Sequence, residues 1–115
     1  MKHYPTLLSV QEFQNVVLEN KACLLYFSTN SCSVGEALDK KVRILISSDF
    51  PEMNFYYVDI NNSPELAASQ SAFIEPTILV FFEGKESIRF SRNISIHHLQ
   101  KSIDRLYKLI FDNSL

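Results

Sequence analysis

Two cysteines and three histidines are the side chains of this sequence best suited to act as nucleophiles or metal ligands. They are Cys23, Cys32, His3, His97 and His98. Their spacing matches no zinc-binding pattern, so we expect no metal site and no cofactor. We predict that the adjacent histidines, early in the last helix, lie on the surface. The chemistry that remains to be considered is that of the thiols.

Cys32 lies between an apolar segment and a helical pattern. Residues 22–27 are continuously apolar, as expected for a strand buried on both faces, and polar residues follow from Ser28. Over residues 35–48 apolar side chains recur at helical spacing, which predicts a second helix beginning at or near Cys32. Unpaired backbone amides and the positive end of the helix dipole would lower the pKa of a thiol there.

The remaining strands are predicted from β-favouring segments. Residues 55–60 form the second predicted strand, and the strongly apolar residues 77–82 form the third. A tight connection at residues 83–85 leads to a fourth strand at residues 86–90, which makes a hairpin. The pattern also allows an edge strand near residues 4–7. Buried parallel strands followed by an antiparallel pair predict a mixed sheet.

Three further helices are predicted from their N-terminal signals. Ser9 and Glu12 fit a capping box for a helix that starts near Val10. Ser63 is the predicted N-cap of a short helix through residue 71, and Ser95 that of a helix running to the end of the chain. The alternation of strands and helices indicates an α/β domain with helices on both faces of the sheet.

Composition limits the classes of function. At 115 residues, with 46% hydrophobic and 21% charged side chains, the chain is expected to fold as a single domain over residues 1–115. Its formal charge of -2 argues against nucleic acid or anionic lipid as a partner, and its two glycines cannot form a nucleotide-binding fingerprint. The apolar runs, residues 22–27 and 78–82 among them, are too short for a membrane span. We expect a cytoplasmic protein with reduced thiols.

Several segments together resemble the thioredoxin family. LLYFSTNSC at residues 24–32 is similar to the family's second strand and active-site loop. YVDIN at 57–61 and SPELA at 63–67 are similar to its middle strand and the following helix. PTILVFF at 76–82, with Gly84, resembles the stretch from the family's cis-proline to its hairpin turn. The resemblance covers nearly the whole chain and implies a thioredoxin-like fold, a three-layer α/β/α arrangement with four helices flanking a mixed sheet.

The chain departs from the family at the residues of its chemistry. Ser-Cys-Ser-Val-Gly at residues 31–35 stands where the family has Trp-Cys-Gly-Pro-Cys, so the first cysteine is kept and the second is replaced by glycine. Tyr26 takes the place of the family's buried aspartate, and Tyr57 that of the nearby lysine. The resemblance therefore implies that dithiol reductase chemistry is lost and that one active-site thiol remains.

Charged neighbours oppose the activation of Cys32. Glu36 stands in the first turn of the predicted helix, and Glu75 precedes Pro76, which the resemblance places opposite Cys32. Carboxylates disfavour a thiolate whereas the helix dipole favours one, and the sequence leaves this balance open. Cys23 cannot serve as a second thiol, because it lies about five strand residues back at ~3.3 Å each. We interpret it as a small buried hydrophobe.

Our first hypothesis is a monothiol protein of redox homeostasis that forms reversible mixed disulfides with protein or small-molecule thiols. If active, it would be a thiol-disulfide oxidoreductase with Cys32 as the nucleophile, and an external thiol would resolve the adduct. The backbone of Glu75 would pair with an extended partner segment. The predicted partner groove consists of Ser31, Ser33, Val34, Gly35, Glu75 and Pro76.

Two alternatives remain. The first is a binding module that uses the same groove without chemistry, as the missing second cysteine and the added carboxylates suggest. The second is a glutathione-dependent monothiol glutaredoxin, which is weaker because the chain lacks that family's Thr-Val-Pro and paired-glycine pattern. The sequence does not indicate an oligomeric state.

Overall fold

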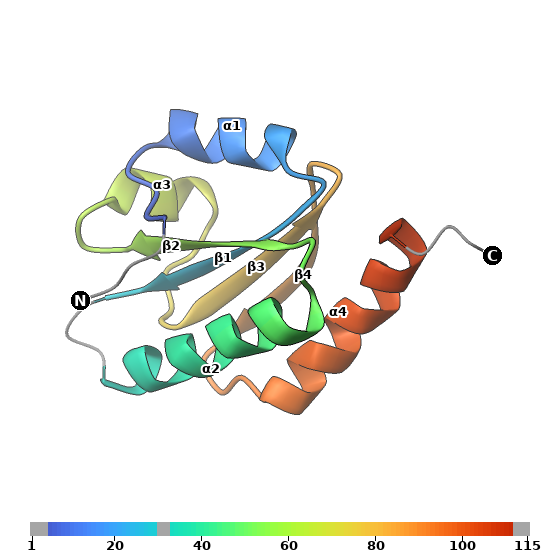
Figure 1. Cartoon of the computed structure of the whole chain (residues 1–115). Coiled ribbons are helices and arrows are strands. Elements are labelled where there is room, and N and C mark those ends of the chain that lie inside the picture. The colour runs from blue at the N-terminus through green and yellow to red at the C-terminus, as the bar shows by residue number, and fades with distance from the viewer. Residues whose placement is uncertain (1–4, 30–32, 112–115) are drawn as a thin grey trace.

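Helices and strands follow one another in the predicted order. The computed structural model describes residues 5–29 and 33–111, with the backbone alone for residues 33–36. Its elements are α1 (Val10–Glu19), β1 (Ala22–Ser28), α2 (Ser33–Asp49), β2 (Asn54–Asp59), α3 (Pro64–Ser69), β3 (Thr77–Phe82), β4 (Lys85–Ser91) and α4 (Ile96–Phe111) (Figure 1). In this part of the chain, no helix has the length and apolar character needed to cross a membrane.

The strands form a mixed sheet in the order β2-β1-β3-β4. β1 pairs in parallel with β2 and antiparallel with β3, and β3 pairs antiparallel with β4. Helices α1 and α3 cover one face of the sheet, and α2 and α4 cover the other (Figure 1). This arrangement confirms the predicted three-layer α/β/α fold with four helices around a mixed sheet.

The segment before α1 touches the sheet at a single point. Thr6 forms an isolated parallel bridge with Tyr57, and the Tyr57 amide donates to the Pro5 carbonyl at 2.9 Å. Among the described residues, the edge strand expected near residues 4–7 is therefore limited to this one bridge. Residue 4 lies outside the described residues. Pro5 has no N–H, so it cannot extend the ladder as a donor.

The helix caps agree with the sequence in two of three cases. The Ser9 hydroxyl accepts from the Glu12 amide at 3.1 Å, and the Ser95 hydroxyl accepts from the His98 amide at 3.2 Å. Ser63 precedes α3 as predicted, but its side chain makes no capping hydrogen bond. Its hydroxyl donates instead to the Leu8 carbonyl at 3.4 Å and so ties the start of α3 to the segment before α1.

The two helical layers enclose two separate hydrophobic clusters. Alternate residues of β1 point to opposite faces, so Leu24 and Tyr26 pack with α2 and α4, and Leu25 and Phe27 with α1 and α3. Every residue of β1 and β3 is buried. These two central strands are the continuously apolar segments of the sequence, which explains why they were the easiest to predict.

Candidate functional site

Several loops leave the sheet at the end where β1 terminates, and three of them concern the candidate site. The register pairs Phe27 near the end of β1 with Thr77 at the start of β3, and Thr77 with Ser91 at the end of β4. The loops after β1, before β3 and after β4 therefore leave the same end of the sheet. The second of these loops carries two of the predicted groove residues, and the first leads into α2.

The predicted nucleophile lies outside the described residues. Cys32 and Ser31 belong to the segment that the structure leaves undescribed, whereas Ser33, Val34 and Gly35 form the first turn of α2. For these three residues, and for residue 36, only the backbone is described. α2 begins at the residue that follows Cys32, in agreement with a helix predicted to start at or near it.

Glu75 and Pro76 form a fixed turn at the start of β3. The peptide bond between them is cis, Pro76 is buried and Glu75 is exposed. The Pro76 carbonyl accepts from the Arg92 amide at 2.9 Å, which joins this turn to the loop after β4. The Thr77 hydroxyl donates to the Ile74 carbonyl and closes the turn on its other side.

Two exposed apolar side chains precede this turn. Phe73 is 73% exposed and Ile74 is 38% exposed, and they are two of the exposed large apolar residues of the described chain. The sequence analysis did not single them out. Their signal is a pair of large apolar residues in a stretch that belongs to no helix or strand, directly before Glu75 and Pro76. They provide an apolar surface on which a partner could pack beside the cis-proline.

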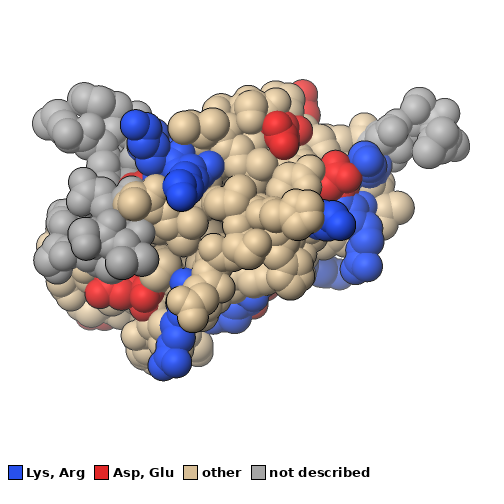
Figure 2. All heavy atoms as spheres, turned by 90° about the horizontal axis from the view of Figure 1, so that it is seen from below, with Lys and Arg blue, Asp and Glu red and all other residues tan. Residues whose placement is uncertain are grey.

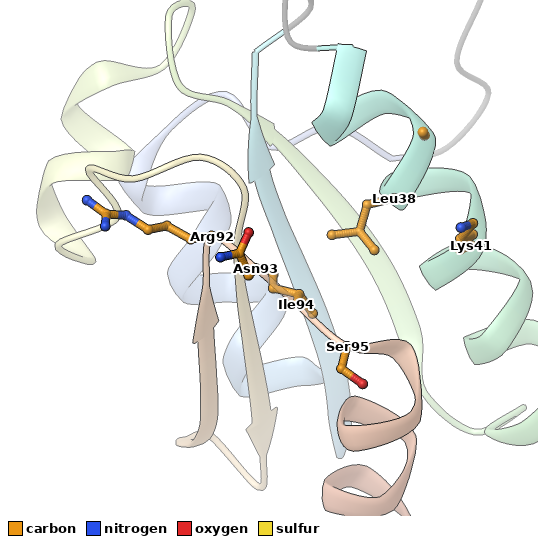
Figure 3. Close-up of a pocket in the computed structure, with 7 residues that line it drawn as sticks. Leu38, Lys41, Arg92, Asn93, Ile94 and Ser95 are labelled. Atoms are coloured by element: carbon orange, nitrogen blue, oxygen red, sulfur yellow. The ribbon is translucent and has the colours of Figure 1, made fainter.

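A cleft of about 670 Å³ lies between α2 and the loop after β4. Its walls are α2, through Leu38 and Lys41, and the loop after β4, through Asn93 and Ile94. Figure 3 shows Leu38 directed from α2 toward this loop, while the Arg92 side chain extends away from α2. The backbone of this loop is anchored to Pro76 through the Arg92 amide. The sequence analysis missed this cleft because the loop has no motif.

An aromatic stack occupies the positions where the resemblance places an aspartate and a lysine. Tyr26 and Tyr57 are partners in the β1–β2 register, and their ring centroids lie 6.3 Å apart at an interplanar angle of 18°. The ring of Phe55 stacks on Tyr26 from 6.1 Å. Tyr26 is fully buried and Tyr57 is 3% exposed. Neither side chain is a carboxylate or an amine, so these two positions supply neither a buried acid nor a lysine.

A buried carboxylate comes instead from α2 itself. Asp39 is 1% exposed, and its Oδ1 atom accepts from Nε of Arg43 at 2.8 Å, one helical turn further along. Asp39 lies on the sheet-facing side of the helix together with Val42 and Ile46, both buried. The helical spacing of these residues is the signal that the sequence analysis overlooked. Asp39 stands one helical turn after Gly35 in α2.

Cys23 behaves as the sequence analysis expected. It is a free, fully buried cysteine, and burial raises the pKa of its thiol from 9.0 to about 12. At neutral pH such a thiol is protonated and poorly nucleophilic. The described residues contain no cluster of three or more potential metal ligands. His97 and His98 are exposed on α4, as predicted.

The structure is an α/β domain with a cis-proline turn at the end of the sheet where the first strand terminates and the chain leads on to α2. A family model described as Thioredoxin matches residues 5–105. The chain belongs to the thioredoxin family.

Known thioredoxins and a thioredoxin-like protein are similar to this chain along nearly its full length. The chain is 28% identical over 109 residues to the thioredoxin-like protein YdfQ of Bacillus subtilis, covering 95% of this chain and 96% of that protein. The thioredoxin of Fasciola hepatica superposes with a TM-score of 0.79 at 28% identity, covering 88% and 97% of the two chains. Mitochondrial thioredoxin 3 of Saccharomyces cerevisiae in its oxidised form gives a TM-score of 0.81 at 20% identity, covering 89% and 94%. At that identity the last match supports the fold alone.

Proposed function

We propose that this thioredoxin-like protein is a monothiol protein of redox homeostasis, which forms reversible mixed disulfides through Cys32 with protein or small-molecule partners. The observation that carries the proposal is the combination of a cysteine one residue before α2 with a cis Glu75–Pro76 turn at the same end of the sheet. A position directly before the first turn of a helix favours the thiolate, because the backbone amides of that turn are unpaired.

The proposed chemistry is disulfide exchange. The Cys32 thiolate attacks one sulfur of a partner disulfide, a new sulfur–sulfur bond forms, and the other partner sulfur leaves as a thiolate and takes up a proton. Position 35 is glycine, and the only other cysteine is buried Cys23. An external thiol must therefore attack the adduct, release Cys32 and become joined to the partner.

Phe73 and Ile74 support a role for the turn in holding the partner. A partner segment that runs along the backbone of Glu75 would cover these exposed apolar side chains. Such burial stabilises a complex by about 25 cal/mol per Å² of apolar surface, so it would raise the lifetime of the adduct.

Intact-mass analysis under non-reducing conditions tests this proposal. The reduced protein is incubated with a small disulfide, and the same is done with Cys32→Ser and Cys23→Ser. We expect one adduct on the wild type and on Cys23→Ser, and none on Cys32→Ser. The proposal is wrong if the folded wild type forms no adduct while the urea-unfolded chain does, because the fold would then suppress the thiol.

A binding module without chemistry is the second candidate. The Tyr26 and Tyr57 stack favours it, because no carboxylate or lysine at these two positions assists proton transfer. Capture experiments with immobilised wild type and Cys32→Ser under reducing conditions separate the two functions. If both proteins retain the same partners, the binding module is supported. Partners that are lost with the serine variant, and that are released by a thiol from the wild type, support mixed disulfides.

A further inference from the structure

A second hollow lies between β4 and α4, away from the proposed thiol site. It has a volume of about 510 Å³. Its floor consists of Ile88 and Phe90 of β4 and Leu106 of α4, all partly buried. We call it the basic groove, because the side chains along its α4 rim are those of His98, Lys101 and Arg105.

The positive charge of the basic groove is not neutralised by the neighbouring carboxylates. Glu86 pairs with Arg89 at 2.8 Å, and Asp104 pairs with Lys108 at 3.0 Å. Among the described residues, no carboxylate forms an ion pair with Lys101 or Arg105, and both are exposed. Figure 2 shows the face covered by α2 and α4, on which basic side chains are spread with fewer acidic ones between them. The groove therefore carries local positive charge although the whole chain is at -2.

β4 offers a free backbone edge beside this charge. Within the described part of the chain, β4 pairs with β3 alone and ends the sheet. Its outer N–H and C=O groups are thus available to a further strand. The strand is also held in place from the opposite face, because Arg89 donates to the Gln70 carbonyl at 2.8 Å. A rigid edge of this kind suits the addition of an extended segment.

We propose that the basic groove binds an acidic polypeptide segment in an extended conformation, which pairs with the edge of β4 and directs its carboxylates toward α4. Lys101 and Arg105 are one helical turn apart, about 6 Å along the axis. This matches the roughly 6.6 Å between alternate residues of a strand, so carboxylates at every second position meet successive basic residues. The side chains at the intervening positions of the segment point to the opposite face of the sheet. The proposal does not depend on thiol chemistry at Cys32.

The test uses a defined peptide and charge-reversal variants. The probe is a blocked eight-residue peptide with glutamate and valine alternating, and the control peptide has lysine in place of glutamate. Binding is measured by fluorescence anisotropy for the wild type and for the Lys101→Glu, Arg105→Glu double variant. Lys40→Glu with Lys41→Glu is the matched control, since both lysines are exposed on α2 and the change in net charge is the same. Lys101→Gln with Arg105→Gln is a milder second variant.

The expected result is binding of the glutamate peptide that weakens at least about tenfold in the Lys101 and Arg105 double reversal, less in the glutamine variant, and little in the α2 control. The lysine peptide should not bind. Amide hydrogen exchange should slow along β4 in the complex, as strand pairing requires. Loss of binding in the α2 control, unchanged exchange along β4, or equal affinity for an oligonucleotide of the same charge would each overturn the proposal. Circular dichroism confirms that each variant is folded.

Discussion

The buried thiol of Cys23 predicts a specific loss of stability at alkaline pH. Burial raises its pKa in the folded protein to about 12, compared with 9.0 for an exposed thiol. Above pH 9 the unfolded chain releases this proton while the folded protein keeps it, so ionisation favours the unfolded state. The stability that the neutral thiol contributes is complete below pH 9 and is lost as the pH rises toward 12.

The magnitude follows from the two pKa values. The linkage relation gives a loss of about 1.4 kcal/mol at pH 10 and about 2.7 kcal/mol at pH 11 relative to neutral pH. Other groups titrate in this range as well, so the quantity to measure is the difference between the wild type and Cys23→Ala. The alanine variant loses some stability at every pH through the cavity it creates, but it lacks the steep alkaline decline.

Urea unfolding at pH 7, 9, 10 and 11, in the presence of a phosphine reductant, supplies the measurement. Val58→Ala is the matched control, because Val58 is fully buried in the same cluster as Cys23 and carries no titrating group. We expect the curves of Val58→Ala and the wild type to run parallel and that of Cys23→Ala to converge on the wild type as the pH rises. A constant gap between wild type and Cys23→Ala from pH 7 to 11 would refute the reasoning.

Three further predictions concern a turn, an ion pair and a surface. Gly84 has a φ of 82°, so Gly84→Ala should lower the free energy of unfolding by about 1 to 2 kcal/mol, as measured by urea denaturation. Arg43→Met breaks the ion pair with buried Asp39 and should lower the free energy of unfolding by about 1 to 2 kcal/mol at pH 7; an unchanged value in urea denaturation would speak against a stabilising ion pair. Because Phe73 is 73% exposed, the melting temperature of Phe73→Ser should lie within about 1 °C of that of the wild type. The same variant should give a lower yield of mixed disulfide when it is incubated with a disulfide-containing protein.

The central layer of the fold could be predicted from the sequence because its signals are local. β1 and β3 are continuously apolar, and each is buried along its whole length. The hairpin has Glu83 and Gly84 with positive φ values of 52° and 82°, the geometry that a two-residue hairpin turn needs. Caps at Ser9 and Ser95 depend on residues three positions away, so they too can be read locally.

Features that depend on distant contacts could not be predicted. The Ser63 hydroxyl turns away from its own helix because the Leu8 carbonyl, 55 residues away, lies within reach. Phe73 and Ile74 are apolar, and composition alone gives no reason to expect them on the surface beside a cis-proline. The basic groove arises only when α4 packs beside β4, two elements whose charges are unremarkable in the sequence.

The Tyr26 and Tyr57 stack connects the altered chemistry to stability. A buried carboxylate requires desolvation, which a protein tolerates where the carboxylate has a function, such as accepting a proton from a second cysteine. Position 35 is glycine here, so an acid at position 26 would have no such proton to accept. An aromatic pair removes the desolvation penalty and fills the same space with stacked rings.

Tyr26→Asp should therefore lower the free energy of unfolding by about 4 kcal/mol or more, because it combines a cavity with an isolated buried charge. Tyr26→Phe, which keeps the ring, should lower it by about 1 kcal/mol. Urea denaturation distinguishes the two effects, and a Tyr26→Asp variant as stable as Tyr26→Phe would show that the site accommodates a carboxylate after all.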